Sequence, residues 1–227
     1  MSIKDNLQEL NKLHKSLRQT LTTGDDKALA IQLFLALHSQ LHSRDVSPNT
    51  PWSYEDLLLE GLEEAEFRKI PEGQEHSLIW IVWHLSRIED VTMNGLVARR
   101  DQVFERGSWQ AKIGSPITHA ANGTGLEVAQ ALSSVVDIVA LRAYRVAVGI
   151  STQEIVQSLT LSDFKRKVSP EDIQRISKEG AVVPAGKDVV DYWSRRDVAG
   201  LLLMPPTRHT IVHWNEARKI LDLIKAR

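Results

Sequence analysis

The chain has 227 residues, of which 42% are hydrophobic and 25% charged, so it is long enough to bury a core and has the composition of a soluble globular protein. Its formal net charge of -1 shows no basic surplus, which argues against a nucleic-acid binder. The absence of cysteine excludes disulfides, cysteine-ligated metals and a thiol nucleophile from the protein itself, and is consistent with a reducing cytoplasm.

The lack of a recognisable secretory signal in this sequence also favours the cytoplasm. The first residues are polar, and no apolar segment of a secretory signal follows them. No apolar run reaches the length of a membrane span, so we expect no membrane partner.

Helical periodicity dominates the chain from its start. Apolar residues at three- and four-residue steps predict a first helix over 5–21, and Asp25 or Asp26 caps a second helix that ends before Ser47. The glycine- and proline-containing stretch 101–124 is predicted to be an irregular connection. Further helices are predicted over 53–67, 75–99, 125–148, 188–203 and 205–226, with two short ones that begin at Ser151 and Ser169. The pattern predicts an all-α protein with four long core helices.

Two histidines near the C-terminus have the spacing of a metal-binding pair. His209 and His213 lie four residues apart on a predicted helix, so their imidazoles lie on one face and can share an ion. His84, in the middle of an apolar helix, would add a third imidazole with a dry wall around it. Three histidines and one open position are typical of a catalytic zinc site, and nickel, iron or manganese would fit with additional waters. The alternative is that these are core or surface histidines with ordinary hydrogen bonds.

A second pair competes for the same interpretation. His38 and His42 also lie four residues apart, but near the predicted end of their helix, where the helix dipole favours histidine without any metal. His14, His76 and His119 have no partner at ligand spacing and are predicted to be solvated.

Two familiar helical metal sites are disfavoured by missing residues. A zinc-protease helix needs a glutamate directly after its first histidine, and Thr210 stands there. A di-iron carboxylate bundle needs glutamate three residues before histidine on two helices, and no histidine of this chain has it. Peptide hydrolysis and di-iron oxygen chemistry are therefore not expected.

The two ligand segments together resemble a known family. The stretch SLIWIVWHLSRIE over 77–89, the preceding PEGQEHS and the motif HTIVH over 209–213 are similar to the DinB/YfiT-like metal-binding four-helix bundle superfamily. The resemblance covers residues 25–227, which implies a DinB-like four-helix bundle domain there, with residues 1–24 as an N-terminal helical extension. The chain departs from many members at Trp214-Asn215-Glu216, where a small residue or glycine often follows the histidine pair.

The resemblance also implies a site and a chemistry. His84, His209 and His213 would be the metal ligands, with zinc or nickel as the ion. Members with known chemistry are thiol S-transferases or thiol-dependent isomerases, so a low-molecular-weight thiol would be the cosubstrate of a small-molecule substrate. Related bundles often form homodimers. The catalytic residues stay unassigned, and no further cofactor-binding residue is implied.

Other residues near this site have two interpretations each. Arg87 lies one turn from His84 and could bind a carboxylate of a ligand, or form a surface salt bridge with Glu89 or Asp90. The carboxylates considered as partners of the imidazoles are those of Asp90, Asp137 and Glu216. The tryptophans predicted as core or pocket wall are Trp80, Trp83, Trp193 and Trp214. A non-catalytic bundle that binds a small ligand or protein partner is the alternative function, and DNA binding is the least favoured.

Overall fold

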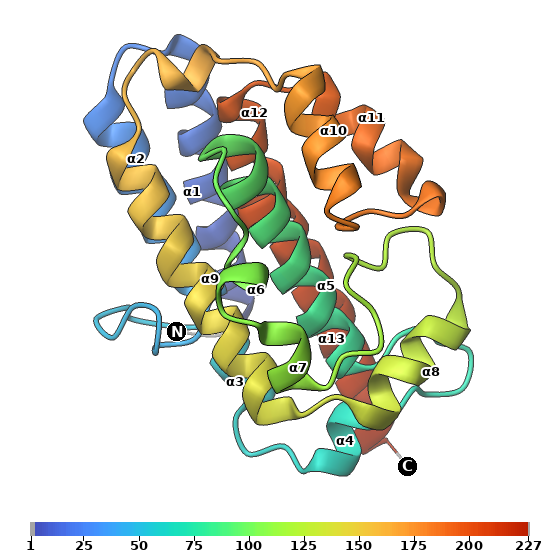
Figure 1. Cartoon of the computed structure of the whole chain (residues 1–227). Coiled ribbons are helices and arrows are strands. Elements are labelled where there is room, and N and C mark those ends of the chain that lie inside the picture. The colour runs from blue at the N-terminus through green and yellow to red at the C-terminus, as the bar shows by residue number, and fades with distance from the viewer. Residues whose placement is uncertain (1–2, 227) are drawn as a thin grey trace.

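The computed structural model describes residues 3–226, and every regular element that these residues form is a helix. The four helices of the core bundle are α2 (Lys27–Leu41), α5 (Leu78–Asp90), α9 (Ile138–Ser158) and α13 (Thr210–Lys225) (Figure 1). Within the described part of the chain, β-structure is limited to one isolated antiparallel bridge between Lys167 and Asp197. The predicted all-α class with four long core helices is confirmed.

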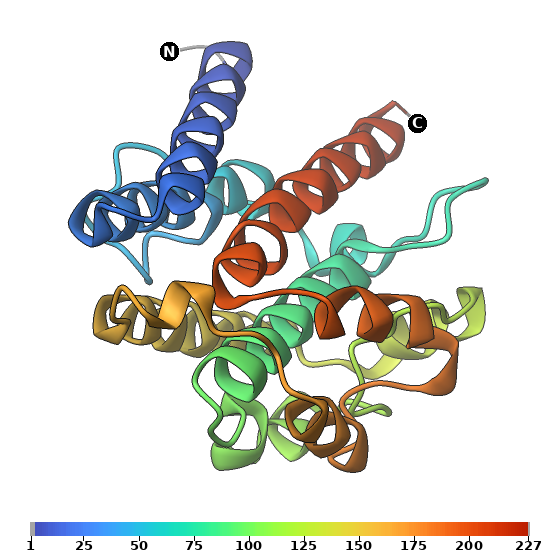
Figure 2. The same ribbon diagram turned by 90° about the horizontal axis from the view of Figure 1, so that it is seen from above.

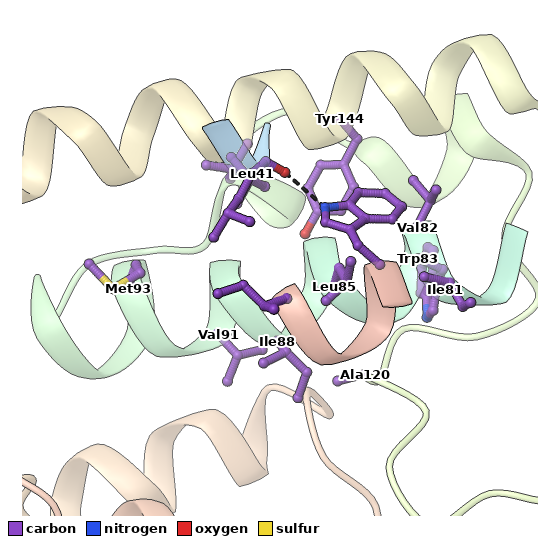
Figure 3. Packing of buried hydrophobic residues seen from close by; sticks show 14 of the residues in the cluster. Leu41, Ile81, Val82, Trp83, Leu85, Ile88, Val91, Met93, Ala120 and Tyr144 are labelled. Atoms are coloured by element: carbon purple, nitrogen blue, oxygen red, sulfur yellow. Dashed lines mark hydrogen bonds between the residues drawn. The ribbon is translucent and has the colours of Figure 1, made fainter. Parts of the chain in front are cut away.

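The central helix is α5, and all of its residues are buried. Its β-branched and aromatic residues have low intrinsic helix propensity, so the helix is stabilised mainly by packing on every side. Ser77 caps its start by accepting a hydrogen bond of 3.1 Å from a backbone N–H in the first turn. Ile81 and Ile88 of α5 lie with Tyr144 of α9 in the buried cluster (Figure 3).

The long helices are extended or linked by shorter ones. Seven residues of π-helix, η1 (Val91–Val97), follow α5, and another π-helical segment, η4 (Met204–His209), leads into α13. The links before α9 are α3 (Tyr54–Leu59), α4 (Glu64–Arg68), α6 (Val103–Arg106), α7 (Trp109–Ile113) and α8 (Leu126–Val135). Those after it are η2 (Asp163–Lys165), α10 (Pro170–Lys178), η3 (Pro184–Gly186), α11 (Lys187–Ser194) and α12 (Val198–Leu202).

The N-terminal helix α1 (Ile3–Thr23) packs along α2, while α10 and α11 lie on the opposite side of α5 (Figure 2). Leu10 and Leu17 of α1 are fully buried, and Nε2 of His14 lies 2.9 Å from the carbonyl oxygen of Leu203. A division of the chain at residue 24 stays a prediction. Among residues 3–226, no helix combines the length and apolarity that crossing a membrane requires.

Two predicted helices are divided in the structure. The predicted helix 53–67 breaks at Gly61, whose φ of 75° is in the left-handed region, so α3 and α4 are separate. The predicted helix 125–148 breaks before Asp137, whose side chain caps α9. Because α9 then continues to Ser158, Ser151 lies inside the helix and does not begin a new one; its hydroxyl donates a hydrogen bond of 2.8 Å to the core side chain of Asn94.

Other helix boundaries also differ from the predicted ones. The predicted helix 75–99 is α-helical only over α5, and the predicted helix 188–203 is divided into α11 and α12, where Asp197 caps the second. The segment 101–124 contains α6 and α7 and is therefore not wholly irregular. The carboxylate of Asp90 accepts the backbone N–H groups of Val103 and Phe104 at 2.9 and 2.8 Å, so the first turn of α6 is capped by a residue from α5. A local sequence pattern contains no sign of such a cap.

Candidate metal centre

His84 presents one ring nitrogen to the interior of the bundle. Only 3% of its surface is exposed, and its Nδ1 lies 2.6 Å from the carbonyl oxygen of Ala120, in the connection between α7 and α8. Because a carbonyl oxygen only accepts, Nδ1 carries the proton and donates it. The Nε2 of the neutral ring therefore has a free lone pair directed away from Ala120.

The histidine pair meets His84 at this point. His209 ends η4 and His213 lies one turn further, in α13. The Nε2 atoms of His84 and His209 are 3.2 Å apart, and the ring of His213 lies 4.8 and 4.5 Å from the two other rings, centroid to centroid. One nitrogen of each ring lies within 4.8 Å of the other two, so the group could hold a metal ion. Four-coordinate zinc with bonds of about 2.0–2.1 Å separates its ligand nitrogens by about 3.3 Å, close to the distance between His84 and His209.

Glu216 orients His213 from outside this group. Its carboxylate accepts one hydrogen bond from Nδ1 of His213 at 2.7 Å and another from Nδ1 of His76 at 2.6 Å. Burial raises the pKa of Glu216, but the hydrogen bonds from His213 and His76 outweigh it and lower the pKa to about 2. With Nδ1 of His213 donating to an ionised carboxylate, its Nε2 is left for the centre, as in metal-binding imidazoles.

Two imidazoles of the three-histidine group are held neutral. Burial, and then the neighbouring His209 and His213, lower the pKa of His84 well below its usual value. Burial, and then His213, lower the pKa of His209 to about 3. Neutral imidazole is the form that binds a metal, so neither ring has to lose a charge-bearing proton near pH 7.

An aromatic wall encloses one side of the group. Trp80 stacks on His84 with centroids 4.6 Å apart, and His76 stacks on Trp80 at 3.4 Å. Trp80 is a buried core residue that stacks against the histidine group, and Trp83, Trp193 and Trp214 are fully buried core residues, so the four tryptophans predicted as core or pocket wall all lie in the core. The prediction that His76 is solvated is wrong, because this ring is stacked and bonded to Glu216.

The two other histidines predicted to be solvated also have partners. His14 bonds to the Leu203 carbonyl, and Nδ1 of His119 accepts the backbone N–H of Ala121 at 3.1 Å. The contact of His14 joins α1 to the residue that ends α12, far away in the sequence, whereas the contact of His119 is local. His119 is half-buried, and burial lowers its pKa.

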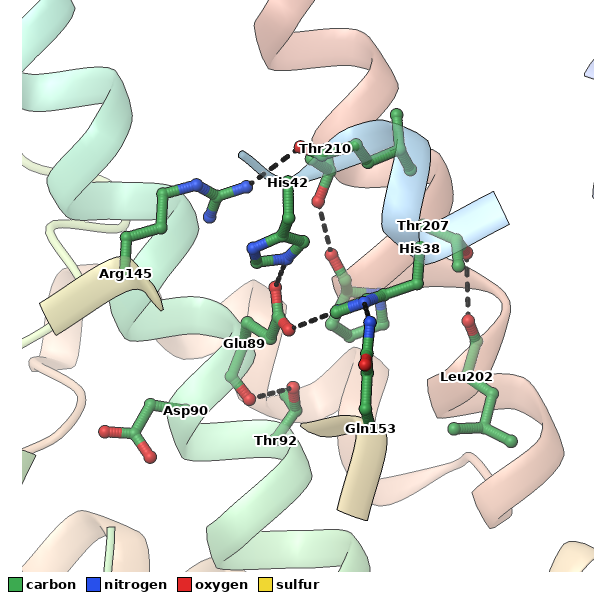
Figure 4. A network of polar contacts seen from close by, with 12 residues as sticks. His38, His42, Glu89, Asp90, Thr92, Arg145, Gln153, Leu202, Thr207 and Thr210 are labelled. Atoms are coloured by element: carbon green, nitrogen blue, oxygen red, sulfur yellow. Dashed lines mark hydrogen bonds and ion pairs between the residues drawn. The ribbon is translucent and has the colours of Figure 1, made fainter. Parts of the chain in front are cut away.

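The second pair forms a separate buried cluster. Nε2 of His38 and Nε2 of His42 lie 2.8 and 2.9 Å from the two carboxylate oxygens of Glu89, and all three side chains are fully buried (Figure 4). This group, too, could hold a metal ion. The helix dipole alone therefore does not account for the pair. Glu89 was not predicted as its partner; the available signal was an acidic dipeptide, Glu89-Asp90, in a largely apolar helix.

The hydrogen bonds of the two clusters differ. At the three-histidine group, the Nδ1 protons of His84 and His213 are donated to acceptors outside the group. At the second cluster, both Nε2 atoms already face Glu89, and Nδ1 of His42 is buried without a hydrogen-bond partner among the described residues. Burial and then Arg145 lower the pKa of His42 to about 3, so this ring is neutral. Two rings of the first group, those of His84 and His213, thus donate the outward hydrogen bonds typical of metal-binding histidines, whereas Nδ1 of His209 is buried without a hydrogen-bond partner among the described residues.

Arg87 is committed to the core. Its Nη1 donates to the hydroxyl of Tyr144 at 3.0 Å and lies 3.4 Å from Asp90, and its Nε donates to the carbonyl of Thr118 at 2.9 Å. The guanidinium also lies over the ring of Phe104. The pairing with Asp90 is confirmed, but the predicted surface location is wrong, because Arg87 and Asp90 are both buried. These bonds leave Arg87 engaged away from any ligand carboxylate.

Of the carboxylates considered as partners of the imidazoles, Glu216 is the one that bonds to a histidine of the group. Asp90 caps α6 and Asp137 caps α9. Sequence spacing could not rank them, because Glu216 was one of several acids within a turn or two of a histidine.

A family model described as the DinB superfamily matches residues 52–203, more than half of the chain. The chain belongs to the DinB superfamily. The resemblance seen in the sequence is thereby confirmed, and with it the helical fold. The part matched to the DinB superfamily includes His84 but ends before His209 and His213. No curated protein matches the chain.

Proposed function

We propose that this DinB superfamily protein is a metal-dependent enzyme whose ion, zinc or nickel, is held by His84, His209 and His213. The observation that carries the proposal is the convergence of three imidazoles from α5, η4 and α13, two of which donate their Nδ1 protons outward. Three protein ligands leave a coordination position for a substrate, which is the arrangement of catalytic rather than structural zinc.

The chemistry proposed is transfer or isomerisation that depends on a small thiol. A divalent ion at such a site lowers the pKa of a thiol or water in its open position and so supplies a nucleophile near neutral pH. Because the chain has no cysteine, the thiol would arrive as a low-molecular-weight cosubstrate. We also propose that the protein acts in the cytoplasm and forms a homodimer.

Residues of the chain support this role by position. Glu216 keeps the ring of His213 in one tautomer, and His76 holds the other carboxylate oxygen of Glu216. Trp80 covers the face of His84 and excludes water from it. Side chains around the centre are thus held before any substrate binds, which lowers the cost of binding.

The test begins with elemental analysis of protein loaded with zinc or nickel and then dialysed. We expect about one ion per chain in the wild type and in a control variant His119→Ala, and none in a His84→Ala/His209→Ala double variant. If the double variant retains an ion, the metal binds elsewhere, and the cluster of His38, His42 and Glu89 is the first candidate. If the wild type binds no ion, the proposal is contradicted. A thiol-consumption assay with an alkylating electrophile follows; a metal-loaded protein without activity would favour the non-catalytic bundle.

A further inference from the structure

A hollow of about 140 Å³ lies beside His209. Three helical segments contribute its wall, and these segments are α5, α11 and η4. Besides His209, the lining residues are Ile88, Val189, Tyr192, Trp193, Met204 and Pro205. None of these six carries a charge, and the Tyr192 hydroxyl is their only side-chain oxygen.

The hollow adjoins the three-histidine group directly. His209 belongs to both, and Ile88 lies one turn after His84 on the same face of α5. A different surface borders the group at His213, where His76 and Glu216 form a hydrogen-bonded rim with side chains 21 and 30% exposed. The group therefore lies between an apolar hollow and a polar, partly exposed rim.

The wall determines what the hollow can bind. A water molecule needs about two to four polar partners, and an apolar cavity of about 150 Å³ stays dry and accepts benzene. A charged group would lose its hydration in this hollow without gaining an ion-pair partner from the lining residues. An uncharged alkyl or aryl group loses nothing of this kind, and its burial is favourable.

We infer that the hollow binds an uncharged apolar substituent, of butyl to phenyl size, on the molecule whose reacting atom lies at the three-histidine centre. This inference rests on the proposed function for the identity of the centre. It narrows the substrate class to small thiols, or their acceptors, with an apolar group on one side of the reacting atom. Charged or hydroxylated parts of the other reactant, the one that does not occupy the hollow, face the rim formed by His76 and Glu216.

The experiment measures the binding of alkanethiols to cobalt-substituted protein through the thiolate-to-cobalt absorption. From ethanethiol to butanethiol, affinity should rise about fourfold per methylene. 2-Mercaptoethanol, which has a hydroxyl in place of the methyl of propanethiol, should bind more weakly than propanethiol. Val189→Phe should fill the hollow and reduce butanethiol affinity at least tenfold, whereas Val190→Phe, a half-buried neighbour outside the lining, should leave it unchanged. Equal affinities along the series, or equal effects of the two variants, would overturn the inference.

A metal-free measurement separates this inference from the proposed function. Ligand-observed NMR should show benzene binding to metal-free wild type and Val190→Phe, but not to Val189→Phe. If benzene binds in this way and the protein takes up no cobalt, the hollow stands and the proposed function fails. If cobalt binds and benzene does not, the centre stands and the inference about the hollow is overturned.

Discussion

Replacing Glu216 with glutamine should weaken metal binding without unfolding the protein. The carboxylate accepts hydrogen bonds from Nδ1 of His213 at 2.7 Å and from Nδ1 of His76 at 2.6 Å. An amide has one oxygen for these two donors and no charge, so at least one imidazole loses its acceptor. Loss of such an outer partner commonly reduces metal affinity 10- to 100-fold. That range corresponds to about 1.4–2.7 kcal/mol of binding free energy.

The assay is competition for zinc between the protein and a chromophoric chelator at pH 7.5. Asp222→Asn is the matched control, because it removes an exposed carboxylate from the same helix, α13, outside the histidine group. His76→Ala should weaken zinc binding less than Glu216→Gln, since it leaves the bond between Glu216 and His213 in place. Thermal melting of the metal-free variants verifies that the fold persists.

Two results would refute this reasoning. One is a zinc dissociation constant for Glu216→Gln equal to that of the wild type, which would mean that His213 does not need its outward hydrogen bond. The other is an equal loss of affinity in Asp222→Asn, which would indicate a general effect of negative charge and not the positioning of one imidazole.

The second cluster leads to two further predictions. Gly149→Ala should lower the free energy of unfolding by about 1–3 kcal/mol in urea denaturation, because a Cβ there would lie 2.7 Å from Nδ1 of His42 and 2.9 Å from Cγ2 of Val46. In a helix without such contacts, replacing glycine with alanine usually increases stability by about 1 kcal/mol. An increase in stability would therefore contradict this packing. The pKa of His42 is lowered to about 3 in the folded protein and is near 6.5 in the unfolded chain, so its contribution is complete above pH 6.5 and is lost as the pH falls toward 3. The unfolding free energy of metal-free protein should therefore fall between pH 6 and 4 by up to about 1.4 kcal/mol per unit more than in His42→Gln, and equal slopes would refute the assignment.

Helix periodicity was the most informative local signal. It predicted α1 and α2 closely, with Asp26, one of the two candidate residues, as the cap of α2, and it predicted the cap at Ser169 before Pro170. It failed where a helix continues or stops for reasons outside the segment. Gly149 looks like a helix end, but it lies inside α9, where the ring of His42 occupies the space that a side chain would need.

At the candidate metal centre, too, the sequence predicted local features and missed the contacts between distant segments. The spacing of His209 and His213 placed two imidazoles on one helix face, and the resemblance added His84. Neither could show that His84 donates to the Ala120 carbonyl or that Glu216 joins His213 to His76, because these contacts link segments distant in the sequence. Such contacts determine the tautomers, and thus which nitrogen can bind a metal.

The sequence by itself determined the helical class, the absence of a protein thiol and the residue types of the three-histidine group. These properties depend on composition and on spacing within one helix, which are local. Only the tertiary structure placed Glu89 between His38 and His42 and opened the apolar hollow beside His209. Both arise where separate helices pack together, and the shape and polarity of such a junction depend on side chains that no single segment contains.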